Sequence, residues 1–236
     1  MALYVYAITK ASHPLDLDGM QGIGEVSEVR PVREGSLCAV VSEAPEQLSM
    51  KREALQAHYD VQERLYADGV ILPLGFGFLA PDEDAVRTVI GESAEQFAQR
   101  LDELTDRVEF NVKGIQDEEA LLRQIATESE PVRRLNEATR GGGGTYEERL
   151  ELGQLLAEEV QARQAALAET VAVALRPHAA AERLSEPSQQ YFISASYLVD
   201  KDRGEEFTKA AEELTEGWTE GTELRVRGPL PPYSFA

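Results

Sequence analysis

The chain has 236 residues, with 43 acidic against 23 basic side chains and a formal net charge of −20. This excess of negative charge repels phosphate backbones and anionic lipid headgroups, so we expect neither a nucleic acid nor a membrane surface as a partner. The longest apolar run, residues 70–79, is shorter than the roughly 20 residues that cross a bilayer, so we expect a soluble chain. The single cysteine, Cys38, excludes an internal disulfide, so we expect the reducing cytoplasm.

The first part of the chain predicts a small antiparallel sheet with a helix on one face. Residues 3–8 (LYVYAI) are apolar, β-branched or aromatic, and indicate a strand that is buried on both sides. A hairpin follows, in which a turn at 34–36 joins a valine-rich arm to the apolar run 37–41. The valines of the first arm are Val26, Val29 and Val32. Residues 50–68 then carry apolar side chains at helical spacing and predict a helix.

The run 70–79 begins with a strand that has no polar face, so both of its faces should be covered. Pro73 ends this strand because proline cannot donate a hydrogen bond to a neighbour, and Gly75 and Gly77 allow a sharp bend after it. We do not interpret these glycines as a phosphate loop, because no G-x-G-x-x-G pattern follows. The order strand, hairpin, helix, strand predicts a ferredoxin-like split β-α-β sandwich over residues 1–80.

A second domain is predicted over residues 81–236, because an acidic run begins a helix there and changes the composition. Its pattern indicates two short helices, a half-buried strand with Glu109 on the polar face, and a helix that ends near Pro131. After a long helix, the pattern indicates a strand at 190–199, another helix and a last short strand. The predicted fold class is therefore α+β with two domains.

The long helix of the second domain is predicted over about residues 145–176. Glycines precede it, and Thr145 with Glu148 three residues later forms the pattern of a capping box. Its apolar stripe is narrow, which is typical of a helix that lies along a core by one edge. A coiled coil with a partner helix remains the alternative.

The sequence lacks the common patterns of catalytic and metal sites. The three histidines, at positions 13, 58 and 178, do not form H-x-x-x-H, and a single cysteine cannot form C-x-x-C. There is no G-x-S-x-G, and His58 lies on the apolar stripe of its helix, which is typical of a core histidine. We therefore expect no enzymatic activity, no catalytic residue, no metal ion and no cofactor.

The C-terminal residues 228–236 (GPLPPYSFA) combine three prolines with apolar side chains. The prolines fix an extended path at low entropic cost, and Leu230, Tyr233 and Phe235 are groups that a free tail has no reason to carry. We therefore expect this Pro-rich tail to dock, either on its own chain beside the glycines of the 70–79 run or on a partner protein.

Five segments of the sequence together resemble one known family. They are Tyr4-x-Tyr6-x-Ile8, Leu55-x-x-His58, the run 72–77 (LPLGFG), the helix entry 146–153 and the ending 228–235 (GPLPPYSF). In this order, over the whole chain, they are similar to the gas vesicle protein GvpL/GvpF family. The resemblance implies a two-domain α+β protein with a ferredoxin-like N-terminal domain. It also implies an accessory or minor structural protein of gas vesicle formation, associated with the vesicle and its major shell protein, without enzymatic activity or cofactor.

The resemblance suggests a protein-binding role for the apolar residues of the 70–79 run and of the tail. The shell protein is small and apolar and has to be kept from aggregating, so a soluble acidic partner would offer it a sheet edge or an apolar groove. We predict that this surface, which could also contact other gas vesicle accessory proteins, lies in the cleft between the two domains. Its predicted residues are Leu74, Phe76, Phe78, Tyr233 and Phe235. An oligomeric scaffold acting through the long helix, and an enzyme with a small ligand between the domains, remain alternatives.

Overall fold

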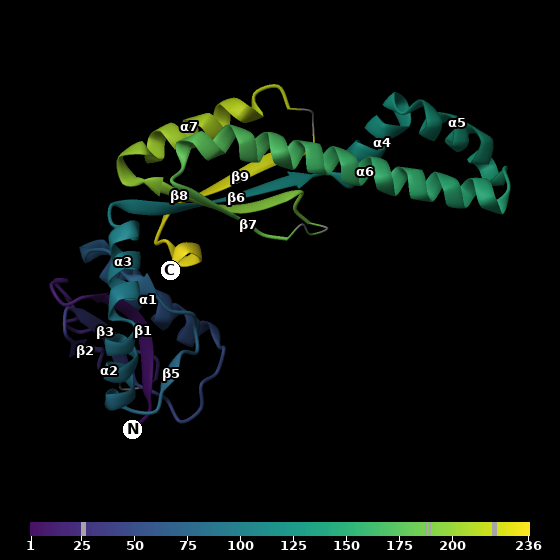
Figure 1. Cartoon of the computed structure of the whole chain (residues 1–236). Coiled ribbons are helices and arrows are strands. Elements are labelled where there is room, and N and C mark those ends of the chain that lie inside the picture. The colour runs from purple at the N-terminus through teal and green to yellow at the C-terminus, as the bar shows by residue number, and fades with distance from the viewer. Residues whose placement is uncertain (25–26, 187, 189, 219–220) are drawn as a thin grey trace. The chain divides into compact units, whose positions relative to one another are not determined.

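The structure is a computed structural model that describes residues 1–24, 27–186, 188, 190–218 and 221–236 (Figure 1). It confirms the predicted α+β class, with two sheets and one long helix. Contacts divide the chain into two compact units, which are Met1–Glu109 with Pro229–Ala236, and Phe110–Gly228. By contacts, the first unit therefore extends past the boundary predicted after residue 80 and includes the C-terminal tail.

The first unit is built on an antiparallel sheet in which β1 (Leu3–Lys10) is a central strand. The other strands are β2 (Arg30–Glu34), β3 (Leu37–Glu43), β4 (Leu72–Pro73) and β5 (Leu79–Ala80). Their order is β2-β3-β1-β4, and β5 also pairs with β1. This is the strand order of a ferredoxin-like sheet. The described part of the connection 11–29 contains no helix, which departs from that plan, and Val26 of the predicted hairpin lies outside the described residues.

Three helices pack against this sheet. The helix α1 (Arg52–Asp68) covers one face, where Val61 and Leu65 pack with Tyr4, Tyr6 and Ile71 in a buried cluster. The next two are α2 (Glu83–Glu92) and α3 (Ala94–Leu104). Of these, α2 contacts β2, β3 and β5, and α3 contacts β1 and β4. This packing is the reason why the contacts assign both helices to the first unit.

The second unit repeats the same strand order. Its elements are β6 (Arg107–Gln116), α4 (Glu118–Glu128), α5 (Glu130–Thr139), α6 (Tyr146–Leu175), β7 (Ala181–Leu184), β8 (Ile193–Asp200), α7 (Gly204–Thr215) and β9 (Thr222–Leu230). The sheet order is β7-β8-β6-β9. Counted from the first strand of each sheet, both sheets therefore follow the order 2-3-1-4. The helices α6 and α7 contact each other over one face of this sheet (Figure 1).

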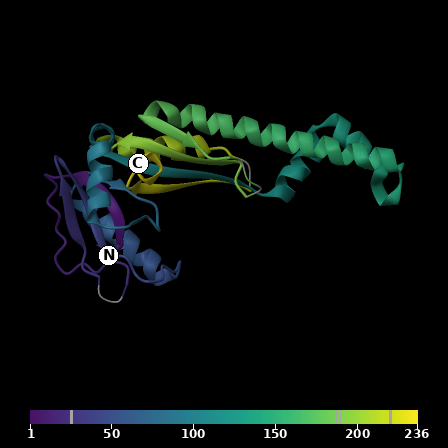
Figure 2. The ribbon, with the colours of Figure 1, turned by 60° about the horizontal axis from the view of Figure 1, so that its bottom comes forward.

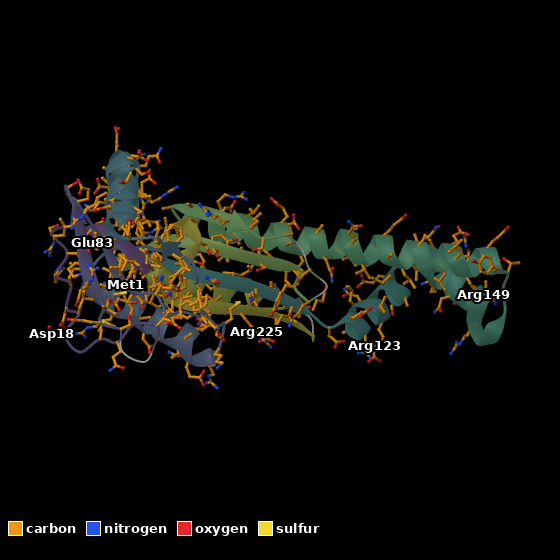
Figure 3. The ribbon with its side chains drawn as sticks, turned by 90° about the horizontal axis from the view of Figure 1, so that it is seen from below. Met1, Asp18, Glu83, Arg123, Arg149 and Arg225 are labelled. Atoms are coloured by element: carbon orange, nitrogen blue, oxygen red, sulfur yellow. The ribbon has the colours of Figure 1, made fainter. Side chains whose placement is uncertain are left out.

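The long helix α6 extends beyond its sheet, as Figure 2 shows. Its N-terminus carries the predicted capping box between Thr145 and Glu148. Only residues near its C-terminal end are fully buried, and its N-terminal half packs on α4 and α5 through a small cluster formed around Leu121, Ile125 and Val132. Charged side chains such as Arg123 and Arg149 cover the outer surface of this projecting helical arm (Figure 3).

A helix ends close before Pro131, as predicted, but Pro131 also lies at the start of a further helix that was not predicted. The helix predicted to end near this residue is α4, which ends at Glu128, and Pro131 occupies the first turn of α5. Proline is tolerated in a first helical turn because the N–H group that it lacks has no intrahelical partner there. The strand β7 was not predicted either, because its four residues are largely exposed and carry no apolar alternation.

Candidate functional site

All five residues predicted to bind a partner belong to the first unit as contacts define it. Leu74, Phe76 and Phe78 lie in the segment between β4 and β5, and Tyr233 and Phe235 lie in a short 3₁₀ helix (Tyr233–Phe235) at the C-terminus. The structure therefore groups them as a loop and a tail, which are described in turn.

The segment 74–78 is a bulge in an interrupted edge strand. On one side of it, Leu72 and Pro73 of β4 pair with Ile8 and Ala7 of β1, and on the other side β5 pairs with the start of β1. Two further hydrogen bonds frame the bulge, since Leu74 N–H donates to Tyr6 O and Val5 N–H donates to Phe78 O. The edge strand thus leaves β1 after β4 and returns to it at β5.

The side chain of Tyr4 stabilises the bulge from the central strand β1. Its hydroxyl accepts a hydrogen bond from Gly77 N–H at 2.9 Å and lies 3.0 Å from His58 Nδ1. The neutral imidazole of His58 donates its one N–H to the Leu74 backbone, so that proton lies on Nε2, and Nδ1 accepts from the Tyr4 hydroxyl. Gly77 has a φ of 96°, in the left-handed region that favours glycine, so this turn depends on the glycine as well.

Gln62 supplies an additional hydrogen-bond donor at the interruption. Its side-chain Nε2 donates to Tyr6 O and to Leu74 O, both at 2.8 Å. Both carbonyl groups lie where the ladder between β1 and its edge strand stops, so without Gln62 they would lose this donor. The side chain is fully buried on α1.

Burial sets the protonation of this network. It raises the pKa of the Tyr4 phenol to about 12, so the hydroxyl keeps its proton at neutral pH. Burial also lowers the pKa of the His58 imidazole below its usual value, against the effect of a hydrogen bond with the Leu74 backbone. His58 is therefore a neutral, hydrogen-bonded core histidine, as its position on the stripe predicted.

The C-terminal tail lies against the same unit. Ser234 donates two hydrogen bonds to the carboxylate of Glu109, from its backbone N–H to Oε2 and from its hydroxyl to Oε1, each at 2.7 Å. Phe235 is 4% exposed, and the ring of Tyr233 contacts that of Tyr59 edge-on. Glu109 was expected on the solvent side of a half-buried strand, but it is buried because the tail covers that side.

Phe78 is the predicted contact residue that is most available to a partner. It is 50% exposed, as is Leu79, which follows it in β5 and was not predicted. In contrast, Phe76 packs edge-on against His58 and Tyr4, and Phe235 is buried. Of the five predicted residues, Phe78 is thus the one that the bulge presents to solvent.

The described residues lack the arrangements that a metal site or a membrane-spanning helix requires. They contain no cluster of three or more His, Cys, Asp or Glu side chains arranged to hold a metal ion. No helix within the described ranges combines the length and apolar character needed to cross a bilayer. Cys38 is buried, and burial raises the pKa of its thiol, so it is not an activated nucleophile.

Comparison with known proteins connects this geometry to a family. The family model described as "Gas vesicle synthesis protein GvpL/GvpF" matches residues 2–236. The chain belongs to this GvpL/GvpF family.

Individual relatives in the family match over nearly their full length. The chain is 42% identical to gas vesicle protein F of Streptomyces sp. (strain CB03234), over 100% of this chain and 99% of the relative. It is 30% identical to gas vesicle protein L of the same strain, over 99% of this chain and 92% of the relative. The resemblance noted in the sequence is therefore confirmed, and the chain is a gas vesicle protein of the GvpL/GvpF family.

Solved structures in the family share the fold. The crystal structure of GvpF from Anabaena sp. PCC7120 matches with a TM-score of 0.86 and 21% identity, over 99% of this chain and 97% of that one. The crystal structure of GvpF from Microcystis aeruginosa matches with a TM-score of 0.80 and 22% identity, over 99% of this chain and 98% of that one. At this level of identity the match concerns the fold alone.

Proposed function

We propose that this GvpL/GvpF protein acts in gas vesicle formation by binding the vesicle shell protein, as an assembly chaperone or a minor component of the shell. The observation that carries the proposal is the family match over residues 2–236, to a family described by gas vesicle synthesis. The net charge of −20 supports it, because a strongly charged partner keeps an apolar protein in solution. On this proposal the protein works in the cytoplasm and at the vesicle, and catalyses no reaction.

The bulge between β4 and β5 is the contact surface that we propose for the shell protein. Phe78 ends the bulge and Leu79 begins the edge strand β5, and each is half exposed, whereas most of the apolar residues of this sheet are buried. Edge strands offer unpaired backbone groups to an incoming strand, and exposed aromatic side chains are typical anchors of protein interfaces. A segment of an apolar shell protein can pair its backbone with the edge strand and pack its side chains on Phe78 and Leu79.

In this proposal the remaining predicted residues act indirectly. Leu74 and Phe76 fix the bulge through backbone hydrogen bonds and ring packing, and Tyr233 and Phe235 fix the tail beside α1. Their substitution would weaken partner binding only by loosening the surface around Phe78. This distinguishes them from Phe78, whose substitution leaves the packed core unchanged.

The proposal is tested by co-expressing the shell protein with tagged variants of this chain. The double variant Phe78→Ser, Leu79→Ser removes the exposed apolar pair, and Val89→Ser is a matched control because Val89 is 48% exposed on α2. We expect the double variant to retain its circular dichroism spectrum and to co-purify about tenfold less shell protein. Equal recovery with the double variant, the control and the unmodified protein would remove the bulge from the mechanism. No recovery with the unmodified protein would refute shell-protein binding itself.

A further inference from the structure

The second unit contains an apolar groove of about 810 Å³ that neither the family nor the proposed function explains. One wall is the long helix α6, where lining residues recur from Leu156 to Ala172 on a single face. The other wall is formed at one end by Leu122 of α4 and at the other end by Phe192 and Ile193 at the start of β8. The groove lies entirely within the second unit.

The length of the groove indicates an elongated occupant. The lining residues of α6 extend over 17 positions, from Leu156 to Ala172, and the 16 steps of about 1.5 Å between the two ends correspond to roughly 24 Å along the helix axis. A partner helix of about four turns has this length. A compact small molecule would fill only a part of it.

The composition of the wall favours a helix over an extended strand. The face of α6 that lines the groove carries four small side chains, at Ala157, Ala165, Ala168 and Ala172. Small residues allow two helix axes to approach closely, at about 8 Å. Since the backbone of α6 is already hydrogen-bonded within the helix, a strand laid against it would leave its own backbone groups unpaired, whereas a helix arrives with these groups satisfied.

The charges beside the groove define the partner further. Two carboxylates, Glu118 and Glu169, belong to the lining, and the described lining residues include neither Lys nor Arg. We propose that this groove binds an amphipathic α-helix of a partner protein, whose apolar stripe is flanked by Lys or Arg side chains. The apolar stripe contacts the alanine face, the aromatic wall takes up its larger side chains, and the basic flanks pair with the carboxylates.

A local feature fixes the aromatic wall. Phe192 N–H donates to Gly114 O at 3.0 Å, and the ring of Phe192 lies so close over Gly114 that a Cβ atom there would overlap it. A glycine on β6 therefore allows Phe192 to lie flat against the sheet. The wall is thus already formed in the free protein, which reduces the cost of binding.

This inference does not depend on the proposed function. The groove and the bulge lie in different units and share no residue. The double variant of Phe78 and Leu79 should leave helix binding at the groove unchanged, and a groove variant should leave the bulge unchanged. Failure of one proposal is therefore distinguishable from failure of the other.

The test uses the full chain and a fluorescein-labelled probe peptide of about 16 residues, built from Leu and Lys so that one helical face is apolar. A scrambled peptide of the same composition carries the same charge without the stripe, and a Leu/Glu peptide carries the stripe with opposite charge. Binding is followed by fluorescence anisotropy at about 0.15 M salt, where attraction between distant exposed charges is screened. The variant Ala165→Phe fills the groove, and Ala162→Phe is the matched control, since both residues are exposed on α6 and only Ala165 lines the groove.

We expect the amphipathic Leu/Lys peptide to bind at least about tenfold more tightly than both other peptides, and Ala165→Phe alone to weaken it by about tenfold or more. If the peptide binds Ala165→Phe and Ala162→Phe equally strongly, its binding is a general attraction to an acidic surface, and the proposal is overturned. Absence of binding, or equal binding of the Leu/Glu peptide, would also overturn it. A concentration-dependent dimer that only Ala165→Phe abolishes would assign the groove to a second copy of this chain instead.

Discussion

Replacing Tyr4 by Phe removes a single oxygen atom from the centre of the first unit. That oxygen accepts the hydrogen bond of Gly77 N–H and donates to His58 Nδ1. The phenyl ring can keep the contacts of the Tyr4 ring with Tyr6, His58 and Phe76, so the substitution tests the hydrogen bonds almost alone.

The size of the stability loss follows from the two groups that lose a hydrogen-bond partner, the N–H of Gly77 and Nδ1 of His58. Leaving a buried donor or acceptor unpaired costs about 1–3 kcal/mol. His58 is 1% exposed, and Gly77 is partly exposed, so the imidazole should contribute nearer the upper end and the amide nearer the lower end. We expect Tyr4→Phe to lower the free energy of unfolding of the first unit by about 2–4 kcal/mol.

Two measurements check this expectation. Urea unfolding followed by far-ultraviolet circular dichroism gives the loss in stability. Native-state amide hydrogen exchange of residues 74–79 gives the local effect, which should be an acceleration of about 30-fold or more, equivalent to about 2 kcal/mol. Tyr59→Phe is the control, because the hydroxyl of this half-exposed tyrosine has no hydrogen bond within the described part of the chain and its loss should cost less than about 0.5 kcal/mol.

The reasoning would be refuted by a Tyr4→Phe protein with the stability of the control and unchanged exchange at residues 74–79. In that case the bulge would be held by Gln62 and by packing, and the tyrosine hydroxyl would be replaceable by water. A loss of stability without faster exchange at 74–79 would refute the link between Tyr4 and the bulge.

Three other outcomes follow from the structure. Burial lowers the pKa of His58, so below about pH 6.5 the unfolded chain binds a proton that the folded chain does not, and stability should fall as the pH is lowered from about 7.5 to 5.5. The variant His58→Gln should lack this part of the pH dependence, and identical pH slopes of the two proteins in urea unfolding would contradict it. Ser234→Ala removes one of the two hydrogen bonds that Ser234 donates to the buried carboxylate of Glu109, so carboxypeptidase should digest the tail roughly tenfold faster. An unchanged rate of digestion would show that the Ser234 hydroxyl does not hold the tail. Gly114→Ala should displace the ring of Phe192 and lower the free energy of unfolding by about 1–3 kcal/mol. The fluorescence emission of Trp218, whose ring lies 6.2 Å from that of Phe192, should shift, and an unshifted emission with unchanged stability would contradict the close packing.

Local signals in the sequence predicted several elements of this fold. The aromatic and β-branched run that starts at Leu3 became β1, the helical spacing around His58 became α1, and the pattern of Thr145 with Glu148 became the cap of α6. Each of these signals lies within a single helix or a single strand. Such patterns are readable because neighbouring residues along the chain determine them.

Other features depend on contacts between residues far apart in the sequence. Pro131 suits either side of a helix boundary, so only the arrangement of α4 and α5 on α6 decided its place. The polar side of β6 was expected to face solvent, and Glu109 is buried there because Ser234, 125 positions away, binds its carboxylate. No periodicity within a strand reports such a distant partner.

The sequence by itself determined the α+β class, the membership of a gas vesicle family and the apolar residues from which a contact surface had to be chosen. Only the tertiary structure decided which of these residues are exposed, because the same aromatic side chain is buried or presented according to what packs over it. Phe76 and Phe78 are two positions apart in one bulge, yet Phe76 packs on His58 and Phe78 faces solvent. The difference arises from Tyr4 and Gln62, which hold the bulge from β1 and α1 and thereby set the direction of each side chain.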